Sequence, residues 1–594
     1  MISYIFLLTS SLVFLFPNQE KKLKGENFFA LIFSSFLFAN LLLGFISLIL
    51  ILFGLSNLPI IILSISTTLL IFLIDKKFKN KLCKIRDFLK HEMINFLHFE
   101  NENWKNKFFT FLIIIFLVLI YLSSFGPIDH PDASSYHVGY PFQYLLKRKF
   151  FIDGGLTQGL LGIADYANLA FIQENTIWLI RPLQIINLPI LILFLSTKLK
   201  NKIFILAFLT VPTFIQWSTI GKPLFLGESS LMAIYLIWEN LKTSYSLKLL
   251  LMAALCCITF KISALIIIFP IFLRCAFQKI NTNNIENLFK EIKYLIFAKE
   301  IIFCFIVIFS LIFSRFLITN NFAYPLLIDF FNKDDFQLKQ FSETLSSFGR
   351  DKFFILNIFI PTKISDLGRS IGPISLILFL LILIKEFKNS ILMRNHILLI
   401  TFSQILFLIL FCQGRADYYA APLVSIIYQS DYINLTNFKN NLKTSFYFAL
   451  IFQIFLITIF ISFSIFNNFN YLNDFDKAMK VNAYGYNLSR IINPNLAGKS
   501  LIKDRNTKLY YSKNYIDIDR FKKCEITKKS LKKFDPKIDC LETYKVNQII
   551  TSSDDPISED IYNCKIINLQ KGSRNFLNQK EKEIKYCTKK NLHK

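Results

Sequence analysis

The sequence predicts an all-α bundle of roughly fourteen membrane-spanning helices, with large non-cytoplasmic loops and a small α/β-type domain at the C-terminus. Three observations support this fold class. Hydrophobic residues make up 53% of the 594-residue chain. Apolar runs near bilayer-spanning length recur along it, and basic segments separate them at intervals. A soluble protein would need an implausibly large buried core, so we interpret the chain as a polytopic membrane protein.

The first three apolar runs cover residues 2–16, 28–55 and 58–74. No small-residue cleavage site follows the first run, so we expect it to remain as a span rather than to be removed as a signal peptide. The strongly basic segment 75–107 should be cytoplasmic, because Lys and Arg concentrate in cytoplasmic loops. The net charge of +26 is therefore attributed to membrane topology and not to nucleic-acid binding.

The direction of each later span follows from that of the span before it, because successive spans cross the membrane in opposite directions. The remaining predicted spans are residues 108–125, 183–196, 203–217, 224–238, 249–260, 262–273, 301–318, 371–384, 396–412, 422–435 and 445–466. The runs 249–260 and 262–273 are short for full spans and are predicted to form a hairpin with Lys261 at its outer tip. With this assignment, every short basic loop lies on one side.

Three parts follow from this pattern. Residues 1–107 form an N-terminal three-span module, residues 108–466 a transmembrane module with outer loops 126–181 and 319–370, and residues 467–594 an extracytoplasmic domain. That domain contains Cys524, Cys540, Cys564 and Cys587, which permit two disulfides in one of three pairings. The sequence has no C-x-x-C pair, Walker A loop or dinucleotide glycine fingerprint, which argues against structural zinc and against use of ATP or NAD.

The stretch 126–144, GPIDHPDASSYHVGYPFQY, gathers Asp129, His130, Asp132, Tyr136 and His137 directly after an outward-running span. Carboxylates there can take a proton from an attacking hydroxyl, or hold a divalent cation with Asp129, His130 and Asp132 as candidate ligands. The alternative is a solvated polar loop. Asp132 is preferred to Asp129 as the base, because a helical continuation would place it on nearly the same face as Tyr136 and His137.

This aspartate loop, which continues as D-x-x-x-Y-H-x-x-x-P from Asp132 to Pro141, resembles the first external loop of the GT-C membrane glycosyltransferases. That superfamily includes the protein mannosyltransferases and the aminoarabinose lipid A transferases. The resemblance implies that an acidic residue of the loop, Asp129 or Asp132, is the catalytic base. It further implies a polyprenyl-phosphate-linked sugar donor and a glycan, lipid or protein acceptor. The expected location is the bacterial inner membrane, with the active site on the periplasmic side.

Three later motifs agree with the layout of this family. Lys222 lies in GKP, where many relatives have K-P-D; a leucine replaces the acid here, and Glu228 is the candidate substitute. Lys261 resembles a lysine that recurs after a span. Arg415 and Tyr418 lie in QGRADYYAAP, which resembles a late R-Y-x-x-P motif.

The predicted topology puts these cations on the same membrane face as the aspartates, where they suit a lipid-linked phosphate. We expect Tyr136, His137, Glu228 and Tyr418 to contact the donor as well. For Lys222, Lys261 and Arg415 alike, the alternative is a snorkelling side chain or positive interfacial anchor.

Two other functions stay open on the sequence. A transporter or flippase of lipid-linked glycans would need ionisable residues near mid-membrane and internal repeats, and we identify neither. A non-catalytic envelope assembly protein would use the outer loops only to bind partners. No cofactor is implied apart from the divalent cation considered above, and the expected partners are the sugar donor, its acceptor and the lipid bilayer, with no nucleic acid.

Overall fold

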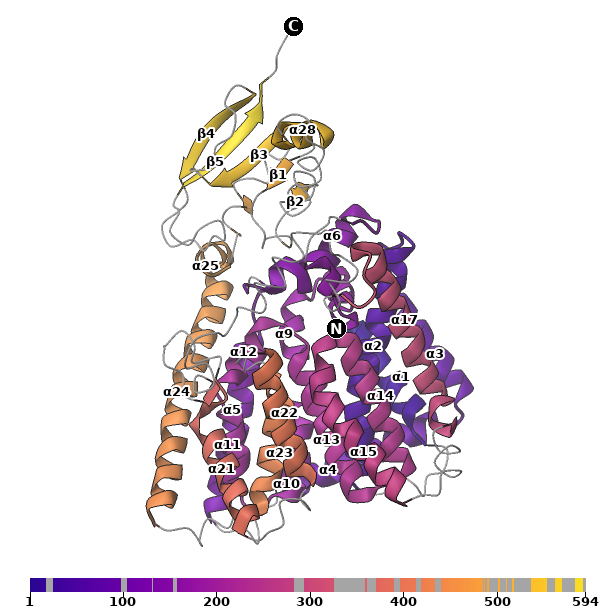
Figure 1. Cartoon of the computed structure of the whole chain (residues 1–594), viewed down its shortest axis with the longest axis vertical. Helices are drawn as coiled ribbons and strands as arrows, with labels where there is room; N and C mark the ends of the chain where they lie inside the picture. The colour runs from indigo at the N-terminus through magenta and orange to yellow at the C-terminus, as the bar shows by residue number, and fades with distance from the viewer. Residues whose placement is uncertain are drawn as a thin grey trace.

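The computed structural model describes residues 1–17, 25–97, 104–130, 132–152, 157–282, 293–324, 358–359, 370–388, 396–412, 418–432, 440–483, 486, 489–490, 500–502, 509, 515–517, 536–552, 561–568 and 583–590. The described chain is mostly helical. It forms an upright bundle with a small β-sheet domain beyond one end (Figure 1). Of the predicted outer loop 319–370, only residues 319–324, 358–359 and 370 are described.

The N-terminal helices share one core with the rest of the bundle. They are α1 (Ile2–Leu15), α2 (Asn27–Leu52), α3 (Ile60–Ile74), α4 (Phe78–Leu97) and α5 (Trp104–Ser124). An apolar window of α2 is 72% buried inside the protein, and α2 packs against α1, α13 (Leu224–Leu241) and α14 (Ser244–Phe260). A helix that is apolar on all sides belongs at the centre of a bundle, which explains the place of α2.

The middle of the chain contributes α9 (Ile180–Leu183), α10 (Leu188–Lys198), α11 (Ile203–Leu209), α12 (Thr213–Ile220), α13 (Leu224–Leu241), α14 (Ser244–Phe260) and α15 (Leu265–Thr282). The predicted span 203–217 is not one helix, because α11 and α12 are bent by 55° at their junction. Pro212 lies in the break and has no backbone N–H to continue the helix. The N–H of Thr213 instead donates to the carbonyl of Ser370 at 3.2 Å.

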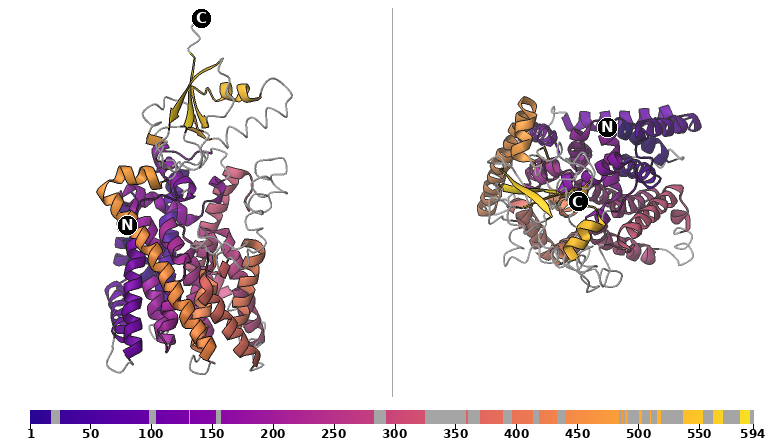
Figure 2. Two further views of the ribbon diagram at one scale, coloured as in Figure 1. Left: turned by 90° about the vertical axis from the view of Figure 1, so that its left-hand side faces the viewer. Right: turned by 90° about the horizontal axis from the view of Figure 1, so that it is seen from above.

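The last helices are α17 (Lys299–Thr319), α21 (Gly372–Lys388), α22 (His396–Cys412), α23 (Ala420–Gln429), α24 (Asn440–Asn473) and α25 (Phe475–Asn482). The 34 residues of α24 exceed the predicted run 445–466. At 1.5 Å per residue this helix is about 50 Å long, so it extends well past a bilayer core of about 30 Å. Figure 2 shows α24 running along the outside of the bundle towards the end that carries the C-terminal domain.

By length and composition, five helices of the described chain can cross a membrane, or six if the bent pair counts as one span. The five are Asn27–Leu52, Trp104–Ser124, Ile177–Lys198, Lys299–Thr319 and Lys443–Asn473. Shorter apolar helices of 10–17 residues accompany them. This helix set is consistent with the predicted multi-pass membrane protein.

Long-range contacts define the two ends of the bundle. At one end the Ser56 hydroxyl donates to the Tyr144 carbonyl at 2.9 Å, and the Tyr471 hydroxyl donates to Asp129 at 3.2 Å. At the other end the Lys202 ammonium donates to the Phe96 carbonyl at 3.2 Å. The aspartate loop and the C-terminal domain therefore share one end, which we call the outer end, and the basic segment around α4 lies at the inner end.

The C-terminal domain is a mixed sheet with a helix. Its elements are β1 (Ser500–Ile502), β2 (Tyr515–Asp517), α28 (Pro536–Thr543), β3 (Gln548–Ser552), β4 (Tyr562–Asn568) and β5 (Glu583–Lys589). The strand order is β2-β1-β3-β5-β4, parallel among β2, β1 and β3 and antiparallel elsewhere. Cys564 and Cys587 face each other on β4 and β5 and form a disulfide. Cys540 is also disulfide-bonded, and Cys524 lies outside the described residues.

Candidate active site

The aspartate loop begins where α5 ends and leads into a π-helical turn, Ala133–His137, followed by α6 (Gly139–Lys147). The N–H of Val138 donates to the carbonyl of Ala133 at 2.9 Å, a spacing of five residues. Single π-helical turns occur often at functional sites, because they re-aim side chains that a regular helix would place elsewhere. Here the turn puts Asp132 at its start and His137 at its end.

Asp132 pairs with a lysine from the distant turn before α13. The Lys222 ammonium lies 2.8 Å from Asp132 Oδ2, and the two side chains are 12% and 42% exposed. Burial by itself would raise the pKa of this carboxyl, but the charges of Lys222, His130 and His137 outweigh it and hold the pKa well below its usual range. Asp132 is therefore an ionised carboxylate that reaches solvent beside a mostly buried cation.

Asp129 is engaged differently. It accepts a hydrogen bond from the Tyr471 hydroxyl, and its Oδ1 lies 3.8 Å from the Arg181 guanidinium. Arg181 is only 2% exposed and also donates to the carbonyls of Ser123 and Pro127 at 3.0 and 2.9 Å. The guanidinium thus ties the end of α5 to the start of the loop, and Asp129 belongs to this structural network.

Close packing of α24 supports the same network. A Cβ on Gly126 would lie 2.4 Å from the Asn468 side-chain oxygen and 2.8 Å from Arg181 Nη1, so a larger residue would have to displace the ends of these side chains. The Asn468 amide in turn donates to the Leu122 carbonyl at 3.0 Å. The long last helix therefore supports the loop by direct contact.

A buried histidine–carboxylate pair lies behind the π-helical turn. His137 Nδ1 is 2.6 Å from Asp165 Oδ1, and both side chains are 3% exposed. The second oxygen, Asp165 Oδ2, accepts from the Gly162 N–H at 2.8 Å at the start of α7 (Ile163–Tyr166). The Asn168 amide donates to the His137 carbonyl at 2.8 Å. These bonds fix the ring, and within the described part of the chain the buried Nε2 of His137 has no hydrogen-bond partner.

Lys261 reaches the same region from the end of α14. A Cβ on Gly162 would lie 1.9 Å from the Phe260 carbonyl oxygen, so this glycine lets the loop pack directly on the helix end. The Lys261 ammonium lies 4.9 Å from the centre of the Tyr418 ring, within cation–π range. These contacts bring Lys261 and Tyr418 together and place Lys261 next to the loop that holds Asp165.

The remaining predicted residues are placed as follows. The ring of Tyr136 lies 4.0 Å from that of His137, centre to centre. Glu228 is 2% exposed on α13, one turn below the outer surface and electrostatically close to Cys257. Arg415 lies outside the described residues.

A metal site made by the loop is not supported. Among the described residues, no three His, Cys, Asp or Glu side chains lie close enough together to hold a metal ion. Asp129 is directed to Arg181 and Tyr471, whereas Asp132 is directed to Lys222. Two carboxylates that face different cations do not make a ligand set with His130.

Four residues that support the candidate site lie outside the motifs recognised in the sequence: Asp165, Arg181, Arg315 and Tyr471. Arg315 is 5% exposed and donates to the Leu161 carbonyl at 3.3 Å from near the outer end of α17. An arginine inside the apolar run 301–318 is a signal that could have been noticed, since charges within spans are costly and usually functional. Asp165 and Arg181 are single charges in otherwise apolar sequence, and Tyr471 carries no local signal at all.

Comparisons with family models, with curated proteins and with solved structures find no match to this chain, so the site has to be interpreted from its own geometry.

Proposed function

We propose that this protein is a GT-C-type membrane glycosyltransferase of roughly fourteen spans, in which the shorter apolar helices also cross the membrane. It transfers a sugar from a polyprenyl phosphate to an envelope glycan, lipid or protein acceptor, on the periplasmic side of a bacterial inner membrane. The observation that carries the proposal is the pairing of Asp132 with Lys222 at the outer end of the bundle: a solvent-reaching carboxylate 2.8 Å from a largely buried cation. The proposed reaction needs a carboxylate as base and a cation that stabilises the leaving phosphate.

The proposed chemistry is a single displacement at the anomeric carbon. Asp132 accepts the proton of the acceptor hydroxyl, and the hydroxyl oxygen forms a new bond to that carbon. The bond from the anomeric carbon to the phosphate oxygen breaks, and its electron pair leaves with the polyprenyl phosphate. The configuration at the sugar carbon inverts. Cations near the phosphate stabilise the charge that develops on the leaving group.

Lys222 links donor binding to the strength of the base. While the ammonium is bound to Asp132, the carboxylate is a weak base because its pKa is lowered. A donor phosphate that draws Lys222 to itself removes this stabilisation, and the pKa of Asp132 then returns towards its ordinary range. A base closer to the operating pH is more effective. The carboxylate would therefore be activated only when the donor is in place.

Other residues are assigned by their contacts. Asp129 is a positioning residue, because Arg181 and Tyr471 already occupy its oxygens. Lys261, Tyr418 and Arg415 are proposed donor-phosphate contacts, and Tyr136, His137 and Glu228 are proposed contacts to other parts of the donor.

The direct test is transfer by purified protein from a panel of polyprenyl-phosphate sugars to membrane extracts that supply acceptors. We expect a labelled product from at least one donor. A flippase would instead move the labelled lipid across vesicle membranes without forming product, and an assembly protein would do neither.

A further inference from the structure

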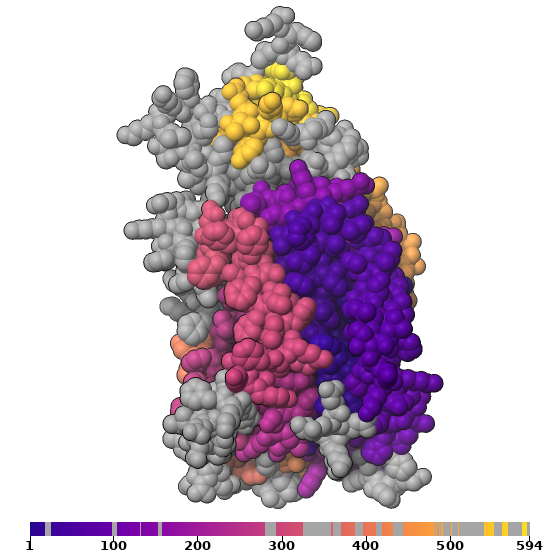
Figure 3. Space-filling model, turned by 90° about the vertical axis from the view of Figure 1, so that its right-hand side faces the viewer, coloured from indigo at the N-terminus to yellow at the C-terminus, as the bar shows by residue number. Residues whose placement is uncertain are grey.

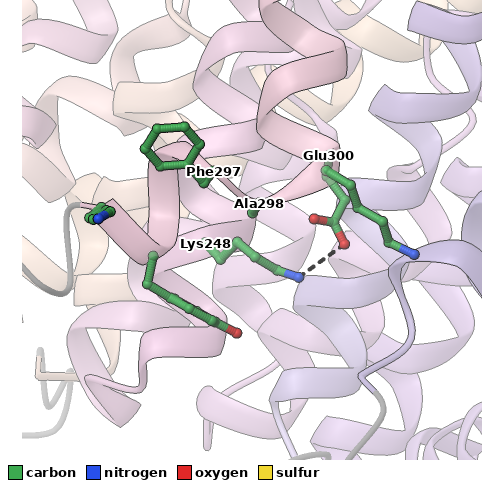
Figure 4. A pocket seen from close by; sticks show the side chains of 7 residues that line it. Lys248, Phe297, Ala298 and Glu300 are labelled. Atoms are coloured by element: carbon green, nitrogen blue, oxygen red, sulfur yellow. Dashed lines mark hydrogen bonds and ion pairs between the residues drawn. The ribbon is translucent and has the colours of Figure 1, made fainter.

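A pocket of about 560 Å³ lies at the inner end of the bundle, where α17 begins. Figure 4 shows it from close by. Its lining includes Lys248, Lys293, Tyr294, Phe297, Lys299 and Glu300. The other end of α17 is at the outer loop, where Thr319 packs beside Gly159. A helix of 21 residues is about 30 Å long, so this pocket is roughly a bilayer thickness away from the Asp132 site.

The pocket carries an excess of positive charge. Lys248 is bound to Glu300 at 3.1 Å, and Glu300 is only 5% exposed, so these two charges cancel (Figure 4). Lys293 and Lys299 are exposed, and no carboxylate of the described chain lies within ion-pair distance of either. Asp75 is electrostatically close to Lys299, but it is already bound to Lys81 at 2.6 Å. Lys299 also lies 4.2 Å from the centre of the Phe14 ring, a cation–π contact that leaves its positive charge uncompensated. Both lysines therefore add positive charge that can attract an anion.

The start of α17 adds to this charge. The helix begins at Lys299, and its N-cap residue, Ala298, provides no side-chain acceptor for the first N–H groups. The N-terminus of a long helix carries partial positive charge and favours phosphate groups. The backbone and the two lysines therefore act on the same small volume.

An apolar surface leads away from the pocket along α17. Phe305, Phe309, Phe313 and Phe316 are 38%, 68%, 55% and 49% exposed, and their spacing places them on one face of the helix. Figure 3 shows α17 in pink as an exposed column beside the indigo N-terminal helices. At the mouth of the pocket, Tyr294 and Phe297 are 63% and 68% exposed, as is usual for aromatic side chains at the edge of a bilayer.

We propose that this pocket binds the phosphate of an anionic phospholipid, whose acyl chains lie along the exposed phenylalanine face of α17. A soluble phosphate would use the lysines alone, whereas the continuous apolar face beside them fits a molecule with both a charged head and hydrocarbon chains. Basic pockets between helices at the inner face of a membrane are suited to such head groups. The site is independent of the sugar chemistry proposed above.

The test is native mass spectrometry of the purified full-length protein, titrated with phosphatidylglycerol or with zwitterionic phosphatidylcholine. A lysine near the membrane surface contributes about fivefold in affinity for anionic lipid, so Lys293→Ala with Lys299→Ala should weaken phosphatidylglycerol binding about 25-fold. Lys248 is kept, because its removal would leave Glu300 buried and unpaired. The control is Lys79→Ala with Lys90→Ala, which removes the same charge from exposed positions of α4 at the inner end.

The proposal holds if the pocket variant loses binding selectively and the control keeps it. Equal losses in the two variants would mean general surface attraction and would overturn it, as would unchanged binding in the pocket variant. Equal affinity for phosphatidylcholine would also contradict the assignment. A last experiment adds inorganic phosphate as a competitor. If it displaces the lipid at low millimolar concentration, the pocket is a site for free anions and the phospholipid proposal is wrong.

Discussion

Replacing Lys222 by methionine should raise the pKa of Asp132 by about one unit. The two charged atoms are 2.8 Å apart. At this distance Coulomb's law gives about 1.5 kcal/mol in water and about 6 kcal/mol at a dielectric constant of 20. Because the Asp132 side chain is 42% exposed, the value near the water limit applies, and 1.4 kcal/mol corresponds to one pKa unit.

The assay is the pH dependence of kcat/KM for sugar transfer, which reports the free enzyme. In Lys222→Met, the acidic limb of the kcat/KM profile should shift to a pH about one unit higher, and the affinity for the donor should fall. Lys222→Arg should keep the limb in place, since the cation remains, and Lys149→Met, at an exposed lysine of the outer loop, is the neutral control. An acidic limb in Lys222→Met that coincides with that of the unmodified protein would refute the coupling.

The ion pair between Asp132 and Lys222 should also contribute to the stability of the fold. The pKa of Asp132 is lower in the folded than in the unfolded chain, so the pair stabilises the fold at pH values above the ordinary carboxyl pKa of about 3.9. We expect Lys222→Met to lower the free energy of unfolding by about 1 kcal/mol or less at pH 7. This difference should shrink as the pH falls below about 3.9 and vanish once Asp132 is protonated in the folded protein.

Three further predictions concern the framework of the site. Arg181→Lys should lower the free energy of unfolding of the protein in detergent by about 1–3 kcal/mol, because one buried carbonyl loses its donor. The melting temperature should fall accordingly, and an unchanged melting temperature would argue against the network. Reduction of Cys564–Cys587, which closes a separation of 23 residues, should destabilise the C-terminal domain by about 3 kcal/mol and speed its proteolysis within the full chain. Free thiols at both positions in the unreduced protein would contradict this pairing. Membrane-impermeant maleimide should label Asn473→Cys on intact cells, and Lys84→Cys only after permeabilisation; the reverse pattern would invert the topology.

Much of the helical layout follows from hydropathy alone. The apolar runs 28–55 and 301–318 became α2 and α17 with boundaries shifted by a few residues, because each run is long and ends in polar sequence. The hydropathy of residues 203–217 gives no sign of the break at Pro212, although the residue itself is the cause. Hydropathy also underestimates the length of α24, since its outer turns are polar and their helical state depends on packing against α5 and the aspartate loop.

The candidate site was predictable only in part. Topology correctly placed Lys222 at the same end as Asp132, but their direct contact depends on how α12 and α13 meet, which no local pattern encodes. The separate engagement of Asp129 joins it to Arg181, 52 residues along the chain, and to Tyr471, 342 residues along the chain. Sequence spacing therefore nominated both aspartates, and tertiary packing distinguishes them.

The measurement that tests the account most directly is sugar transfer by Asp132→Asn and Asp129→Asn in protein that remains folded. Loss of a catalytic base should reduce kcat about a hundredfold or more in Asp132→Asn without weakening donor binding, because the amide keeps the shape but cannot accept the proton. Asp129→Asn should stay within about tenfold of the unmodified protein, since its side chain positions the loop. Full activity of Asp132→Asn would contradict the mechanism.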